Sequence, residues 1–181
     1  MKRVQLFYKD ISEIVGGNGF SVVRLTDKEQ LRVISVICDK AMTEQITIRC
    51  LRTPGCEQML PEVLASMLMK DCKSDMELMV YDVVDGQYRV SLLNKRILML
   101  KTIRMSDAVL LHLITGIPLY MEDDLMQRQS SPFSPESYGI AIPINTIDTE
   151  RLNKELQRAI EEEDYRLASF LHQEIKRRGK S

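Results

Sequence analysis

The chain has 181 residues, with 25 Lys and Arg against 26 Asp and Glu and a formal net charge of −1. This length favours one core domain with a small appendage, and the balanced charge excludes nucleic-acid binding through bulk basic charge. Four cysteines without a C-x-x-C pair argue against a structural zinc site. No signal-peptide-like start and no long apolar run occur, so we expect a cytoplasmic protein with reduced thiols and no membrane contact.

The first third of the chain predicts three strands. Val4–Val15 and Phe20–Leu25 flank the turn cluster Gly16-Gly17-Asn18-Gly19, which tolerates positive φ and is typical of a hairpin. Leu31–Cys38 has adjacent Val and Ile residues, so it predicts a strand that is buried on both faces.

Two helices are expected next, over Ala41–Leu51 and Leu60–Cys72. The second has an apolar stripe at helical spacing, formed by Val63, Leu64, Met67 and Leu68. The methionines are interpreted as core packing, for example Met67, Met69, Met76 and Met79.

Asp85-Gly86 is the strongest hairpin signal, because both residues accept the positive φ of a type I′ turn. It separates the predicted strands Met76–Val84 and Gln87–Leu93, and a further strand is expected at Ile97–Ile103. Because strands and helices come in blocks, the sequence predicts an α+β fold with a mixed or antiparallel sheet and packed helices.

The segment Ile103–Met126 combines a helix, a stop and a strand. Ser106 is the predicted N-cap, and Asp107 places negative charge in the first turn. Gly116 suits a left-handed helix end, and Pro118 prevents the helix from resuming before an apolar strand.

Residues 127–147 are rich in Ser and Pro and predict a linker or loop after a first domain over residues 1–126. Residues 148–181 predict an α-helical hairpin. About thirty residues cannot enclose a core alone, so the hairpin should pair with a copy of itself or dock on a protein partner. The predicted partner-binding residues are Leu152, Leu156, Tyr165, Leu171 and Ile175.

Residues from about Leu31 to Met126 resemble the bifunctional nuclease family, which is associated with DNase and RNase activity. Arg104, Ser106, Asp107 and Ala108 before an apolar helix carry the resemblance, together with Pro118-Leu119-Tyr120 and the hairpin Asp85-Gly86-Gln87-Tyr88. The resemblance implies phosphodiester hydrolysis, with Asp107 and Glu62 as catalytic residues, Arg104 and Ser106 as substrate-binding residues, and a divalent cation such as magnesium as the possible cofactor.

Several of these side chains also have ordinary structural interpretations. Asp107 suits the helix dipole as well as a metal, and Arg104 suits an ion pair as well as a phosphate. The acidic run Glu122-Asp123-Asp124 suits the first turn of a helix, and His112 suits a hydrogen-bonded core position.

The C-terminal residues Leu152–Arg178 resemble the UVR motif, a helical hairpin of excision-repair proteins that pairs with partner hairpins. The leading hypothesis is therefore a nuclease of DNA or RNA, and the alternative is a non-catalytic oligomeric adaptor that recruits a protein through this hairpin. Thr102 and Met105 stand where the nuclease family has Asp and Pro, and the family's Thr-His-Asp becomes Leu60-Pro61-Glu62, which supports the alternative.

Overall fold

A computed structural model describes residues 2–14, 20–69, 73–133, 149–161 and 165–178. It divides into two compact units, Met1–Asp82 with Tyr88–Ile140, and Val83–Gln87 with Ala141–Ser181. The elements in chain order are β1 (Arg3–Glu13), β2 (Ser21–Thr26), β3 (Arg32–Cys38), α1 (Lys40–Cys50), η1 (Cys56–Gln58), α2 (Leu60–Met69), η2 (Lys73–Asp75), β4 (Met76–Val84), β5 (Gln87–Asn94), β6 (Met99–Arg104), α3 (Met105–Thr115), β7 (Leu119–Glu122), α4 (Asp123–Gln129), β8 (Ser131–Pro132), α5 (Thr149–Glu161) and α6 (Tyr165–Arg178).

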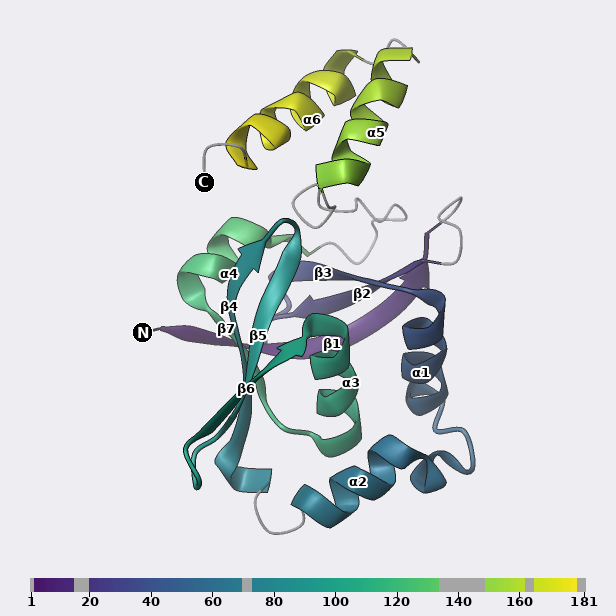
Figure 1. Ribbon diagram of the computed structural model, residues 1–181, viewed down its shortest axis with the longest axis vertical. Helices are drawn as coiled ribbons and strands as arrows, with labels where there is room; N and C mark the ends of the chain where they lie inside the picture. Colours follow the sequence, from purple (N-terminus) through teal and green to yellow (C-terminus); the bar gives the residue numbers. More distant parts are fainter. Residues whose placement is uncertain (1, 15–19, 70–72, 134–148, 162–164, 179–181) are drawn as a thin grey trace. The chain divides into compact units, whose positions relative to one another are not determined.

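An eight-stranded mixed sheet organises the first unit, in the order β6-β5-β4-β7-β1-β2-β3-β8 (Figure 1). β1, β2 and β3 form an antiparallel meander, and β7 joins the two halves by pairing antiparallel with β1 and parallel with β4. The predicted α+β class and mixed sheet are confirmed. The predicted domain boundary at Met126 falls inside α4, which continues to Gln129.

The helix α3 lies against α1, α2 and the strands β3, β6 and β7. The buried face of α3 contains Met105, Ala108 and Val109. Gly116 ends the helix in the left-handed region, at φ 68°, and its N–H donates to the His112 carbonyl at 2.7 Å. The predicted Gly stop is therefore confirmed. Ser106 is not the N-cap as predicted, because the helix begins two residues earlier, at Met105, and Arg104 occupies the N-cap position.

The turn between β5 and β6 extends further along the chain than the sequence indicated. Ile97 and Leu98 lie in the turn and not in the strand, which begins at Met99. The side-chain oxygen of Asn94 accepts hydrogen bonds from the backbone N–H groups of Arg96 and Ile97 at 3.0 and 3.3 Å, and these bonds compete with strand pairing.

In the second unit, α5 and α6 pack on each other through Leu152, Ala159, Ala168 and Leu171. Within the described parts of the chain, no helix combines the length and apolar character that crossing a bilayer requires. The described cysteines Cys38, Cys50 and Cys56 are free thiols.

Candidate functional site

The N-terminal ends of α1 and α3 meet beside the buried end of β3, and we call this region the Arg104 corner: Cys38, Asp39, Arg89, Arg104 and Asp107. Arg104 precedes α3, and its Nε and Nη2 donate to the two carboxylate oxygens of Asp107 at 2.6 and 3.2 Å. The side chains are 73% and 31% exposed, so the ion pair faces solvent. Asp107 also lies in the first turn of α3, as predicted, where negative charge is favourable.

Asp39 brings a second carboxylate to the Arg104 corner. It is the N-cap of α1, and one of its oxygens accepts the Met42 backbone N–H at 2.8 Å. Hydrogen bonding to Asp107 raises the pKa of Arg104, and the charges of Asp107 and Asp39 act in the same direction. Asp39 and Asp107 therefore both lie within electrostatic reach of one exposed guanidinium.

Cys38 lies beneath these carboxylates, at the end of β3, and is almost completely buried. Burial raises the pKa of the Cys38 thiol to about 12, with further contributions in that direction from the charges of Asp39 and Asp107. The thiolate form is the nucleophile, so this cysteine is a packing residue at neutral pH.

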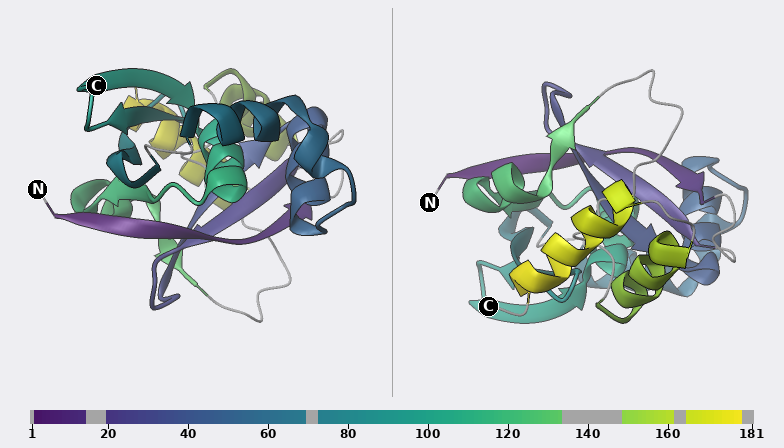
Figure 2. Two further views of the ribbon diagram at one scale, coloured as in Figure 1. Left: turned by 90° about the horizontal axis from the view of Figure 1, so that it is seen from below. Right: turned by 90° about the horizontal axis from the view of Figure 1, so that it is seen from above.

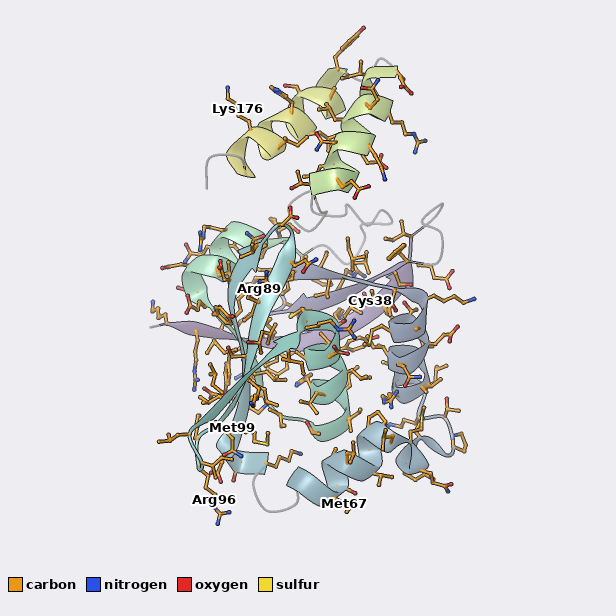
Figure 3. The ribbon with its side chains drawn as sticks, in the orientation of Figure 1. Cys38, Met67, Arg89, Arg96, Met99 and Lys176 are labelled. Atoms are coloured by element: carbon orange, nitrogen blue, oxygen red, sulfur yellow. The ribbon has the colours of Figure 1, made fainter. Side chains whose placement is uncertain are left out.

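Arg89 supplies a second positive charge. It is exposed on β5 and stands in register with Arg104 on β6 (Figure 3 labels Arg89 and Cys38). Like charges directly opposite each other on paired strands are unfavourable without an anion between them. Among the described residues, no hydrogen bond or ion pair joins Arg89 to an acid.

Glu62 has a different environment. Its two carboxylate oxygens accept hydrogen bonds from Nε and Nη2 of Arg49 at 2.6 and 2.9 Å, and the two side chains are only 17% and 6% exposed. Arg49 also donates to the backbone carbonyl and side-chain oxygen of Gln45 at 2.7 and 2.8 Å. The pair fastens the end of α1 to the start of α2.

Glu62 and Asp107 are therefore not brought together. Arg49 follows Asp39 by ten residues along α1, which corresponds to about 15 Å of helix. Asp107 and Ser106 lie at the Asp39 end and Glu62 at the Arg49 end. Sequence reasoning missed Asp39 and Arg89, although an Asp between a buried strand and a helix is a recognisable N-cap signal.

The remaining candidates, three acidic residues and a histidine, lie at positions that their structural interpretations explain. Asp123 and Asp124 occupy the first turn of α4, preceded by Glu122 at the N-cap. His112 Nδ1 lies 2.7 Å from the Ile117 carbonyl, which confirms the predicted hydrogen bond, but the ring is only partly buried and not in the core. Searched over the described parts of the chain, no three His, Cys, Asp or Glu side chains form a group suited to a metal ion.

The hairpin residues divide by burial. Leu152 and Leu171 are buried between α5 and α6, and Leu156 and Ile175 pack against that core. Tyr165 remains 70% exposed. Of the five predicted partner-binding residues, only Tyr165 presents most of its side chain outside the hairpin's own core.

Comparison of the sequence with protein-family models and with curated proteins finds no match in either set.

Proposed function

We propose that this protein is a cytoplasmic nuclease that binds the phosphodiester backbone of DNA or RNA at the Arg104 corner. The observation that carries the proposal is the pairing of Arg89 with Arg104 across two strands, beside the carboxylates of Asp107 and Asp39. A phosphate between the two guanidinium groups would relieve their repulsion. The resemblance of Arg104, Ser106 and Asp107 to the bifunctional nuclease pattern supports the same conclusion.

Each residue has a distinct role in this proposal. Arg104 uses two of its donors on Asp107 and keeps the others for a phosphate oxygen, because a guanidinium carries five N–H groups. The Asp107 carboxylate orients Arg104 and can accept a proton from an attacking water. Ser106 lies between them in sequence and would hydrogen-bond the same phosphate.

A divalent cation suits this corner to a limited extent. Mg²⁺ is often held by one or two carboxylates together with substrate phosphates, and Asp107 and Asp39 are the carboxylates present. Bound there, it would neutralise charge on the phosphate and lower the pKa of a coordinated water. Glu62 is excluded from this group because its ion pair with Arg49 is almost buried, whereas the ion pair of Arg104 with Asp107 is exposed to solvent.

The experiment is hydrolysis of labelled single-stranded DNA and RNA by the full chain with Mg²⁺ or Mn²⁺, with and without a chelator. Asp107→Asn should reduce cutting by about 10²-fold or more, and Arg104→Ala or Arg89→Ala should weaken substrate binding. Arg128→Ala is the matched control, because it removes an exposed arginine from the last turn of α4. Intact substrates under all metal conditions, or full activity of Asp107→Asn, would contradict the proposal.

The second candidate function is a non-catalytic oligomeric adaptor that recruits a protein through the C-terminal hairpin. The exposure of Tyr165 at 70% and Ile160 at 48% supports it, because both lie outside the core formed by α5 and α6. Under this hypothesis, Tyr165→Ser abolishes binding of a partner hairpin while nucleic acids stay intact. Asn153→Ser, an exposed substitution on α5, is its control.

A further inference from the structure

An apolar stripe on α2 faces solvent instead of the core. Leu60, Leu64 and Met67 follow helical spacing and are 69%, 45% and 74% exposed, and Val63 beside them is 38% exposed. The prediction that Met67 packs in the core is therefore wrong. A stripe with this spacing normally marks the face by which a helix is buried, so its exposure indicates a missing contact.

A second group of exposed apolar side chains lies on the β5–β6 turn and β6. Ile97, Leu98 and Leu100 are between 62% and 86% exposed. Leu98 has φ 52°, in the left-handed region that disfavours a bulky L residue. Leu98 is the most exposed of these side chains, and its backbone conformation is strained. Such strain is often found at functional surfaces.

The strand β6 is also an edge of the sheet. Its inner side pairs with β5, and in the described part of the chain no strand pairs with its outer side. The opposite edge strand, β8, contains only Ser131 and Pro132, which offer little for pairing. A six-residue edge strand with unpaired N–H and C=O groups can pair antiparallel with an identical strand about a two-fold axis.

The two groups lie at one end of the first unit. Figure 1 and the left view of Figure 2 both show α2 and the β5–β6 turn at this end, and Figure 3 labels Met67 and Arg96 there. The helix α3 packs on both α2 and β6 and thus connects them. We call this surface the α2–β6 face and define it by Leu60, Val63, Leu64, Met67, Ile97, Leu98 and Leu100.

We propose that the α2–β6 face is the contact surface for a second copy of this chain. At about 25 cal/mol per Å², burying one such side chain corresponds to on the order of 100 Å². The exposed fractions of the seven residues therefore add up to roughly 400 Å² of apolar surface. A stable interface buries about 800 Å² per partner, of which about 60%, or roughly 480 Å², is apolar, so the face supplies most of the apolar area that a dimer needs.

The composition of the face favours a copy of the chain over other occupants. The seven side chains are all aliphatic or Met, which is typical of homodimer interfaces, and β6 is complementary to itself. None of the seven side chains belongs to the Arg104 corner, although Arg104 is the last residue of β6.

The test is sedimentation velocity of the full chain, comparing the native sequence with Met67→Glu/Leu98→Glu. A dimer is expected for the native chain, and the double substitution should raise its dissociation constant by about 100-fold or more. Leu31→Glu is the matched control, because Leu31 is 66% exposed on the turn before β3. It should leave the dimer intact.

Leu98→Gly separates loss of the interface from loss of the fold. Glycine relieves the strain at positive φ, so thermal stability measured at a concentration where the variant is monomeric should not fall, while dimerisation weakens. A monomeric native chain at about 100 µM, whether or not it binds a peptide or vesicles, would overturn the proposal. So would a dimer that survives the double substitution but is lost in Tyr165→Glu.

Discussion

The same kind of ion pair lies near each end of α1, but one pair is buried and the other is exposed. At its C-terminal end Arg49 and Glu62 make two short hydrogen bonds and are 6% and 17% exposed. Near its N-terminal end Arg104 and Asp107 also make two hydrogen bonds but are 73% and 31% exposed. Geometry alone does not distinguish them, whereas exposure does.

This difference separates a structural pair from a candidate site. A buried pair has exchanged its hydration for partner contacts, and removing one member leaves an uncompensated charge. An exposed pair contributes little to stability and keeps free donors for a ligand. We therefore interpret Glu62 as a residue that stabilises the fold, and Asp107 stays the candidate for the proposed action on a substrate.

The largest expected effect is on stability at the buried end. Glu62→Gln should lower the free energy of unfolding by about 3–5 kcal/mol, because Arg49 remains buried without its counter-charge. Urea unfolding followed by circular dichroism measures this. Asp107→Asn, the matched change in the exposed pair, should cost less than about 1 kcal/mol. Equal losses in the two variants would remove the distinction between the pairs.

The second effect is on activity. If the Arg104 corner is a nuclease site, Asp107→Asn should reduce kcat by about 10²-fold or more, the range in which a general base contributes. Steady-state cutting of a labelled oligonucleotide measures it. Glu122→Gln, at the N-cap of α4, serves as the control carboxylate and should cut normally.

A third ion-pair group, around Glu77, predicts acid sensitivity. Arg3 and Lys95 contact the buried carboxylate of Glu77 at 3.0 and 2.6 Å, and Arg3 lies 4.2 Å from the ring centre of Tyr120. Burial by itself raises the pKa of Glu77, but hydrogen bonds from Lys95 and Arg3 outweigh it, so the pKa is lowered overall.

The lowered pKa fixes the direction of the pH effect. The stabilisation from Glu77 is present above the ordinary Glu pKa of about 4.3 and is lost as the pH falls through the lower folded-state value. Glu77→Gln should therefore flatten the fall in melting temperature below about pH 4.3. If the melting temperature of Glu77→Gln falls with pH as steeply as that of the native chain, other carboxylates determine the acid sensitivity.

The smallest effect is expected from Arg89→Ala. Removing one of two like charges in register should leave stability unchanged or raise it by about 0.2–1 kcal/mol. The same substitution should weaken nucleic-acid binding, measured by fluorescence anisotropy at fixed salt. Loss of stability would mean that Arg89 has a structural partner, which would weaken the phosphate interpretation.

Local chemistry predicted the parts of the fold that depend on few residues. Asp85 and Gly86 have φ values of 50° and 74°, as a type I′ hairpin turn requires, and Gly116 ends α3 in the left-handed region. These positions need positive φ, which short-range sequence signals report directly. The buried strand β3 also follows from its apolar run.

The features that the sequence did not predict depend on how helices and strands pack against one another. The stripe of α2 gives the spacing of a buried helix, but spacing does not say that a core lies opposite, and Met67 is exposed. Glu62 and Asp107 both lie in the first turn of an apolar helix, so the local sequence does not distinguish their roles. Only the packing of α1 shows that Arg49 reaches one of them and Asp39 lies near the other.

The most direct test compares Asp107→Asn with Glu62→Gln in one nuclease assay, with activity expressed per folded molecule at a temperature where both variants are folded. The account predicts that Asp107→Asn unfolds close to the native midpoint and loses most of its cutting activity, while Glu62→Gln is less stable and cuts normally. Normal cutting by Asp107→Asn together with loss of cutting by folded Glu62→Gln would contradict it.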